Sequence, residues 1–253
     1  IFLPGGPQAV LMLHGWTGWP GRLAYLADRL HEHGFAVSVP RLPGHGTSMS
    51  DMLRTRARDW LRRSVDEYLD LREEYEQVHL AGTSMGGILA AVIAAEYDVD
   101  RLALLAPAFI NRNALIKLTP LLRWVLRRVR GGWREEEERD PGAIELGREY
   151  GTHNYLRLVS ELYRLQRLGR RVLPQLRSET LVVVSRADRS VPPEVATYVE
   201  HRAHARTLRR VVVDRSNHQI AEHLDRELVA KEVVDWFLRE PLQSPGAAAG
   251  TRR

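Results

Sequence analysis

The chain has 253 residues, of which 44% are hydrophobic and 27% are charged, and its formal net charge is +5 at pH 7. This composition is typical of a globular protein, and the length predicts one large domain or one domain with an insert. Cysteine is absent from the sequence, which excludes disulfide frameworks, thiolate metal sites and cysteine nucleophiles.

The positive charge comes almost entirely from arginine, since Lys117 and Lys231 are the only lysines. Most arginines are interleaved with acidic residues, as in residues 59–76, so we expect solvated faces and predict no nucleic-acid partner. No apolar run reaches the roughly 20 residues that a membrane-spanning helix needs. No signal peptide is visible, and the chain begins at Ile1 rather than Met. We expect a soluble, cytoplasmic protein without an integral membrane segment, as a monomer or a weak dimer.

Short apolar runs rich in β-branched residues alternate along the chain with longer segments of helical periodicity. This order predicts an α/β fold, in which a mostly parallel sheet carries helices on both faces. The expected strands are residues 9–13, 35–39, 78–81, 102–105, 181–185 and 211–213. The expected helices are residues 22–33, 58–75, 85–96, 193–201 and 222–238.

One interval interrupts this alternation, because no good strand candidate lies between Pro107 and Glu179. Residues 113–130 have the spacing of an amphipathic helix with a kink at Pro120. Residues 155–168 predict a second helix. We therefore interpret this interval as a helical insert that lies over the sheet.

The organisation along the chain predicts a single domain, residues 1–242. The helical insert occupies residues 108–178 of that domain and is too small to be expected to have a core of its own. The tail, residues 243–253, is low in complexity, and we expect it to be disordered.

The strongest chemical signal is Gly-Thr-Ser-Met-Gly-Gly at residues 82–87, which fits the pattern G-x-S-x-G. An expected strand ends directly before it, and an expected helix of small residues follows directly. A sharp turn between the two would hold Ser84 in a strained backbone conformation, with its hydroxyl at the carboxyl edge of the sheet. We therefore predict that Ser84 is a catalytic nucleophile.

A serine hydroxyl needs a base, usually a histidine that a carboxylate orients. In this topology the three residues follow in the order Ser, Asp or Glu, His. Asp188 follows an expected strand and His218 follows the last one, so we predict them as the acid and the base. Asp214 and His223 are alternatives, but Asp214 is too close in sequence to serve His218 comfortably, and His223 falls inside an expected helix.

The oxyanion of an acyl-transfer reaction needs two hydrogen-bond donors. One is expected from the backbone N–H of Met85, the residue after the proposed nucleophile. The other is expected from the backbone N–H of Trp16, since His14-Gly15 ends the first long strand and glycine permits a close backbone approach. His14 and His45 are interpreted as structural residues.

These motifs together resemble those of the α/β-hydrolases, and they are most similar to small bacterial carboxylesterases and monoacylglycerol lipases. The matching segments are residues 13–16, 43–46 and 82–87, Asp188 with Val191-Pro192 behind it, and residues 216–218. The resemblance implies an α/β-hydrolase fold with a small helical cap, a Ser84, Asp188 and His218 triad, and an oxyanion hole at Trp16 and Met85. Many relatives carry glycine where this chain has Asn217, a difference that changes loop flexibility and not proton chemistry.

The implied reaction is hydrolysis of short- to medium-chain acyl esters through an acyl-enzyme. We expect a small-molecule ester as the partner, no metal and no organic cofactor. The expected substrate-binding residues are apolar side chains of the insert and of loops near the triad: Trp19, Leu118, Leu122, Trp124, Leu162, Leu165 and Val191. A monoacylglycerol lipase is the alternative enzyme, and a ligand receptor on the same scaffold is the non-enzyme alternative.

Overall fold

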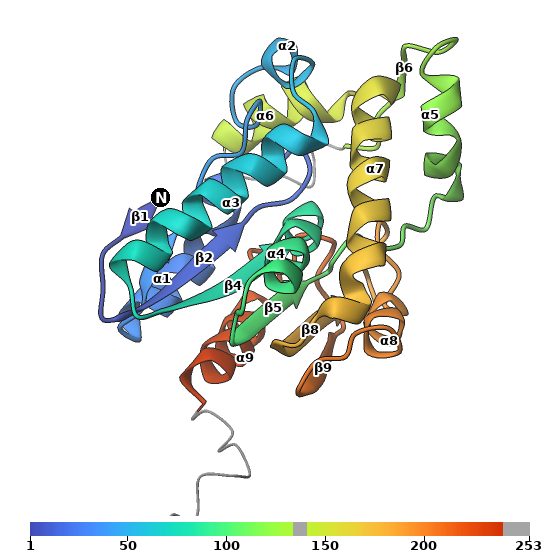
Figure 1. Cartoon of the computed structure of the whole chain (residues 1–253). Coiled ribbons are helices and arrows are strands. Elements are labelled where there is room, and N and C mark those ends of the chain that lie inside the picture. The colour runs from blue at the N-terminus through green and yellow to red at the C-terminus, as the bar shows by residue number, and fades with distance from the viewer. Residues whose placement is uncertain (134–140, 240–253) are drawn as a thin grey trace, which may run out of the picture.

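The computed structural model describes residues 1–133 and 141–239, and its centre is a seven-stranded sheet (Figure 1). The strand order is β1-β3-β2-β4-β5-β8-β9, and every neighbouring pair is parallel except β1 with β3. The strands are β1 (Phe2–Leu3), β2 (Gln8–Leu13), β3 (Ala36–Ser38), β4 (Gln77–Thr83), β5 (Arg101–Leu105), β8 (Glu179–Ser185) and β9 (Leu208–Val213). The predicted mostly parallel sheet is confirmed.

Helices cover both faces of this sheet, as predicted. On one face lie α3 (Ala57–Glu74), α4 (Met85–Glu96), α7 (Leu156–Val172) and α8 (Val195–Glu200), whose apolar side chains form one core cluster. On the other face lie α1 (Ala24–Glu32), which the 3-10 helix Pro20–Leu23 precedes, and α9 (Arg226–Leu238), which form the second cluster. Strand β2 serves both clusters, because successive side chains of a strand point to opposite faces: Leu11 and Leu13 join the first, Val10 and Met12 the second.

The expected strands correspond to β2, β3, β4, β5, β8 and β9, and the expected helix at residues 85–96 coincides with α4. The two-residue strand β1 and the single-turn helix α2 (Met49–Met52) are too short to leave a periodic signal in the sequence. The expected helix at residues 222–238 begins later, at Arg226, so the prediction that His223 lies within a helix is wrong. Asp225 ends the preceding loop, because its carboxylate accepts hydrogen bonds from the backbone of Arg215 and Ser216.

The connection between β5 and β8, residues 106–178, differs from the expectation in its first half. The continuous helix expected at residues 113–130 is wrong, as is the absence of strands. The chain instead forms a 3-10 helix, Ala114–Leu118, then α5 (Thr119–Leu122), and then β6 (Arg128–Arg130), which pairs antiparallel with β7 (His153–Tyr155). Pro120 falls in the first turn of α5, where proline starts a helix and does not extend the preceding one. Helix α7 and the 3-10 helix Leu173–Gln175 complete the connection.

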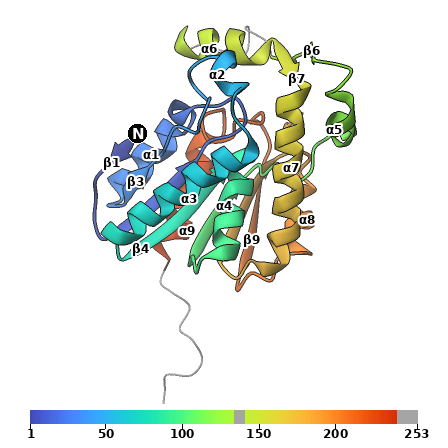
Figure 2. The same cartoon turned by 45° about the horizontal axis from the view of Figure 1, so that its top comes forward.

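Helix α6 (Pro141–Gly151) of this connection lies above α2 at one end of the molecule (Figure 2). The Tyr150 hydroxyl donates a hydrogen bond to the Gly44 carbonyl at 2.9 Å and accepts one from the Thr47 amide at 2.9 Å. The Glu149 carboxylate accepts a further bond from the Met49 amide. These three bonds hold α6 against the loop at residues 43–49. The tail expected at residues 243–253 lies outside the described residues.

A buried histidine lies between the sheet and α9. The His79 ring stacks on Phe237, with 5.2 Å between centroids, and meets Phe35 edge-on at 6.2 Å. Neither ring nitrogen has a hydrogen-bond partner among the described residues. Burial and, to a smaller extent, the charge of Arg101 lower the pKa of His79 to about 4, and Asp100 opposes the shift.

We predict that acid weakens the fold through this histidine. Between pH 6.5 and about 4 the unfolded chain binds a proton at His79 that the folded chain does not, so the free energy of unfolding falls as pH decreases. His79→Phe is expected to reduce that pH slope by about 1 kcal/mol per pH unit. Urea unfolding at several pH values measures the slope. The exposed variant His201→Gln is the control, and equal slopes in all three proteins would contradict the prediction.

Candidate active site

Ser84 occupies the sharp turn between β4 and α4. Its backbone has φ 55° and ψ −113°, a left-handed conformation that costs a non-glycine residue about 1–3 kcal/mol. The Ser84 amide donates to the Leu105 carbonyl at 2.9 Å, and the Ser84 carbonyl accepts from the Ala108 amide at 3.1 Å. These bonds to the end of β5 hold the strained turn in place. The serine is 7% exposed.

The turn is possible only because the backbones around it approach very closely. A Cβ atom on Gly82 would lie 2.3 Å from the Gly86 carbonyl oxygen. A Cβ atom on Gly86 would lie 1.9 Å from the Leu13 carbonyl oxygen. Both separations are shorter than a carbon and an oxygen atom can tolerate, so glycine is required at these two positions. The first and last glycines of the G-x-S-x-G pattern therefore have a steric role.

Three side chains from distant parts of the sequence meet at this turn. His218 Nε2 lies 2.8 Å from Ser84 Oγ, and His218 Nδ1 lies 2.6 Å from Asp188 Oδ2. With the Nδ1 proton donated to the carboxylate, Nε2 is left to accept the serine hydroxyl proton. The arrangement has the geometry of a nucleophile, a base and an orienting acid.

Asp188 lies in the loop after β8, and hydrogen bonds hold both its carboxylate and its backbone. Its Oδ1 accepts hydrogen bonds from the amides of Ser190 at 2.7 Å and Val191 at 3.0 Å, which leaves Oδ2 for the histidine. Arg112, from the β5–β8 connection, donates from Nε to the Asp188 carbonyl at 3.0 Å and from its amide to the Ser190 carbonyl at 3.0 Å. The sequence contains no signal for Arg112, because it acts on backbone atoms far away in the chain.

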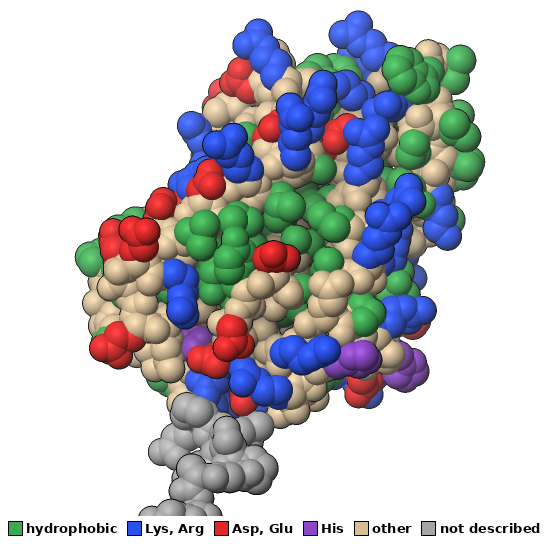
Figure 3. All heavy atoms as spheres, viewed as in Figure 1, with side chains coloured by type: hydrophobic (Ala, Val, Ile, Leu, Met, Phe, Trp, Pro, Cys, Tyr) green, Lys and Arg blue, Asp and Glu red, His purple; other side chains and the backbone are tan. Residues whose placement is uncertain are grey.

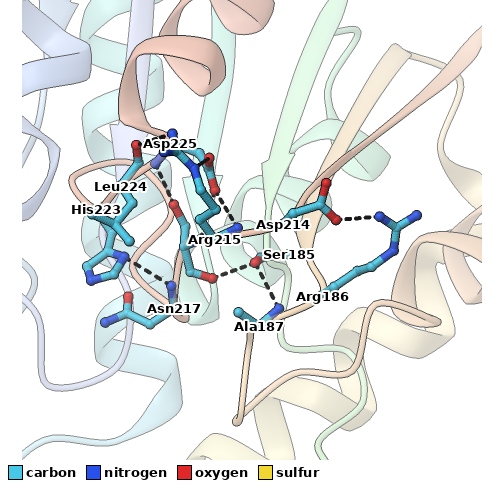
Figure 4. A network of polar contacts seen from close by, with 10 residues as sticks. Ser185, Arg186, Ala187, Asp214, Arg215, Asn217, His223, Leu224 and Asp225 are labelled. Atoms are coloured by element: carbon cyan, nitrogen blue, oxygen red, sulfur yellow. Dashed lines mark hydrogen bonds and ion pairs between the residues drawn. The ribbon is translucent and has the colours of Figure 1, made fainter.

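The loop that carries His218 is held by a second carboxylate, Asp225 (Figure 4). Asp225 Oδ2 accepts from the amides of Arg215 at 2.9 Å and Ser216 at 2.8 Å, and Oδ1 accepts from Arg215 Nε at 3.1 Å. The Asp225 amide in turn donates to Ser216 Oγ at 2.7 Å. Burial would raise the pKa of Asp225, but hydrogen bonds from Arg215 and Ser216 outweigh it and lower the pKa below its usual range.

Ser185 joins this loop to the loop of Asp188. Its hydroxyl donates to the Ser216 carbonyl and accepts from the Ala187 amide at 3.2 Å (Figure 4). Because Ala187 precedes the acid and Ser216 lies two residues before the base, one buried hydroxyl fixes the spacing of the two loops. This bridge was also not predicted from the sequence.

The alternative acid and base are engaged elsewhere. Asp214 forms an ion pair with Arg186, and both side chains are well exposed. His223 accepts a hydrogen bond at Nδ1 from the Asn217 amide at 3.2 Å. Figure 4 shows both contacts beside the Asp225 network. The structure thus brings Asp188 and His218 to Ser84, and it does not bring Asp214 or His223 there.

The expected oxyanion donors lie next to the serine. Met85 is the first residue of α4. A Cβ atom on Gly15 would lie 3.1 Å from Ser84 Cβ, so the backbone before Trp16 is pressed against the serine. Neither the Trp16 nor the Met85 amide donates a hydrogen bond to another residue in the part of the chain that the structure describes. Both N–H groups remain the expected donors to a substrate oxygen.

An aromatic cluster supports the loop of Trp16. The Trp16 ring meets the rings of Trp60 at 5.6 Å and His45 at 6.4 Å, both edge-on. His14 lies 5.2 Å from His45 and accepts a hydrogen bond at Nε2 from the Leu42 amide at 3.2 Å. Burial lowers the pKa of His14 to about 4 and that of His45 to about 3, so both are neutral at neutral pH. Their contacts fit the structural role expected for them.

The seven expected substrate-binding residues differ in burial. Leu162, Leu165 and Val191 are buried in the core cluster on the α4 face of the sheet. Leu118, Leu122 and Trp124 are exposed on the β5–β8 connection. Trp19 is partly buried and packs under the Arg22 guanidinium. The difference arises because α7 packs its leucines toward α4, whereas the segment before β6 is not the helix that was expected at residues 113–130.

Within the described residues, no group of three or more His, Asp or Glu side chains is placed to hold a metal ion. Over the same residues, no helix is both long and apolar enough to cross a membrane.

Comparison with known proteins places this chain in a family. Residues 10–232 match the model of the alpha/beta hydrolase family, so the chain belongs to that family. The chain is 25% identical to a carboxylesterase of Bacillus subtilis (strain 168) over 235 residues, which cover 92% of this chain and 93% of the relative. It is 37% identical to a thermostable monoacylglycerol lipase of Bacillus sp. (strain H-257) over 94 residues, 37% of this chain and 38% of the relative.

Solved structures agree with the fold. A structure described with LipS and LipT, two metagenome-derived lipolytic enzymes, superposes with a TM-score of 0.84 at 21% identity and covers 93% of this chain and 95% of that one. The monoacylglycerol lipase of Paleococcus ferrophilus gives a TM-score of 0.72 at 18% identity, with 90% and 92% covered. The predicted resemblance to esterase- and lipase-like α/β-hydrolases is confirmed.

We predict that Asp225 positions His218. Asp225→Asn keeps the size of the side chain but removes the charge that holds the Arg215 and Ser216 amides. The base then shifts relative to Ser84, and we expect labelling of Ser84 by a fluorophosphonate to slow by about 10- to 100-fold. The control is Asp214→Asn, which breaks only the exposed pair with Arg186 and is expected to label at the wild-type rate. Equal labelling rates for the two variants, at matched melting temperatures, would contradict a positioning role for Asp225.

Proposed function

We propose that the protein is a serine-dependent carboxylic ester hydrolase that acts on short- to medium-chain acyl esters. One observation carries the proposal: His218 lies within hydrogen-bond distance of both Ser84 Oγ, at 2.8 Å, and Asp188, at 2.6 Å. Membership of the alpha/beta hydrolase family supports it, as does the similarity to a carboxylesterase along 92% of the chain.

In the proposed reaction, His218 Nε2 takes the hydroxyl proton as Ser84 Oγ attacks the ester carbonyl carbon. The new carbon–oxygen bond produces a tetrahedral oxyanion. When this intermediate collapses, the bond to the alcohol breaks and His218 returns the proton to the departing alkoxide. Water then attacks the acyl-enzyme with His218 as the base, which releases the acid and restores the Ser84 hydroxyl.

Two further elements of the site favour this reaction. The amides of Met85 and Trp16 are available to the oxyanion, and removal of one such donor costs about 3–4 kcal/mol in known acyl-transfer enzymes. Asp188 is 2% exposed, so its charge acts on the developing imidazolium with little screening by water. The acid thereby stabilises the protonated base that forms in the transition state.

A monoacylglycerol lipase is the second candidate, because the 94 residues shared with the Bacillus sp. lipase are 37% identical. A ligand receptor on the same scaffold does not require a nucleophile, a base and an acid within hydrogen-bond distance of one another. That geometry therefore favours an enzyme.

We expect the three residues to act as one unit. Ser84→Ala and His218→Ala should each lower kcat for p-nitrophenyl ester hydrolysis by at least about 10⁴-fold, and the double variant should be no slower than either single variant. Steady-state kinetics measure this, with melting temperature as the check on folding. The exposed variant Ser50→Ala is the control. Additive losses, or near wild-type activity in Ser84→Ala, would contradict the triad.

Acyl-chain preference separates the two candidate enzymes. A carboxylesterase should have its highest kcat/KM on soluble p-nitrophenyl esters of short to medium chain length, and lower kcat/KM on monoacylglycerols. Hydrolysis of p-nitrophenyl esters of increasing length, beside a monoacylglycerol of matched acyl chain, measures the preference. A higher kcat/KM on the monoacylglycerol would favour the lipase.

A further inference from the structure

Exposed apolar side chains concentrate on the first half of the β5–β8 connection. Trp124 is 79% exposed, Val125 85% and Leu121 74%. Of the large hydrophobic side chains that are exposed among the described residues, more than half lie in residues 115–129: Leu115, Leu118, Leu121, Leu122, Trp124, Val125, Leu126 and Val129. Figure 3 shows hydrophobic side chains gathered at the upper right, where Figure 1 draws α5. A contiguous apolar area of this kind marks an interaction surface.

The same stretch carries positive charge only. Residues 111–133 contain Arg112, Lys117, Arg123, Arg127, Arg128 and Arg130 and no Asp or Glu. On α3, by contrast, Arg62 and Arg63 form i,i+4 pairs with Asp66 and Glu67. We call residues 115–130 the basic apolar surface. The acidic run at residues 135–138 follows it in sequence and lies outside the described residues.

A cleft of about 430 Å³ adjoins this surface. Its lining includes three arginines, Arg123, Arg127 and Arg157, together with Trp124 and Tyr155. Guanidinium groups bind phosphate oxygens in pairs of hydrogen bonds, and Trp and Tyr are the side chains favoured where an apolar medium meets water. The cleft can therefore accept an anionic head group while the neighbouring apolar residues enter an acyl layer.

Two of the three cleft arginines, Arg123 and Arg157, are held in place by contacts with the protein. The Arg123 guanidinium lies over the Trp124 ring at 5.0 Å and 3.9 Å from Glu161, and its Nε atom is buried without a hydrogen-bond partner among the described residues. Arg157 donates to the carbonyls of Leu53 and Thr55. A bound phosphate would add a hydrogen-bond acceptor to a site that is rich in donors.

We propose that the basic apolar surface docks on an anionic phospholipid bilayer. Aliphatic and tryptophan side chains supply insertion into the interface, and the arginines supply attraction to the lipid head groups. A second copy of the chain is a poorer partner, because two such surfaces would bring the arginines of both copies together. The inference goes beyond ester hydrolysis and does not depend on it, since it uses none of the residues at Ser84.

The test measures binding of the Ser84→Ala chain to vesicles, so that lipid hydrolysis plays no part. Co-sedimentation compares phosphatidylcholine vesicles with vesicles that also contain phosphatidylglycerol. We expect binding at least about 10-fold tighter to the anionic vesicles, with a strong decrease as salt increases. Equal binding to the two vesicle types, or no binding to either, would overturn the proposal.

Two pairs of substitutions separate insertion from charge. Trp124→Ser with Val125→Ser should lower the partition coefficient at least about 10-fold, because both side chains lose their apolar contact with lipid. Arg127→Gln with Arg128→Gln should lower binding to anionic vesicles about 30-fold, near 5-fold for each arginine, and should remove the preference for them. All four side chains are exposed, so we expect these variants to fold as the parent does.

Matched controls come from other faces of the molecule. Leu69→Ser with Leu228→Ser removes two apolar side chains that are 41% and 46% exposed, and Arg62→Gln with Arg63→Gln removes two paired arginines. Both controls should bind vesicles as the parent does. A parent that dimerises in analytical ultracentrifugation, and whose Trp124→Ser, Val125→Ser variant is monomeric, would assign the surface to a second copy and overturn lipid docking.

Discussion

The close approach of three backbone segments at the end of β4 is the constraint on which the site depends. A Cβ atom on Gly86 would collide with the Leu13 carbonyl oxygen, and a Cβ atom on Gly82 would collide with the backbone of Gly86 and Gly87 in the first turn of α4. This packing forces Ser84 into a left-handed conformation at the edge of a buried sheet. A surface turn would relax such strain, whereas here the bonds to Leu105 and Ala108 prevent relaxation.

Asp188 and His218, the proposed acid and base, are held in position by groups that take no part in the proposed chemistry. Ser185 links their two loops, Asp225 holds the backbone before His218, and Arg112 holds the backbone of the Asp188 loop. Each of these contacts ends on a backbone atom. The supporting network therefore fixes where the loops lie, while the Asp188 and His218 side chains retain their remaining hydrogen-bonding atoms for each other and for Ser84.

The β5–β8 connection has two environments with different consequences. Its later part, α6 and α7, is bound to the body of the protein through Tyr150 and through the leucines that face α4. Its earlier part turns leucine, valine and tryptophan outward beside arginines. Burial of the later part gives a stable frame near the loop at residues 43–49, and exposure of the earlier part leaves a surface suited to an amphiphilic partner.

By itself, the sequence determined the parallel sheet and helix α4, and it predicted Ser84, Asp188 and His218 as the nucleophile, the acid and the base that we propose, because strand periodicity, glycine spacing and chain order are local or ordinal signals. Only the tertiary structure decided the rest. Segment 113–130 has helical periodicity, yet Pro120 and the pairing of β6 with β7 divide it, and its apolar side chains face outward. Arg112, Ser185 and Asp225 support the site through backbone atoms contributed by other segments, and no spacing in the sequence encodes such contacts.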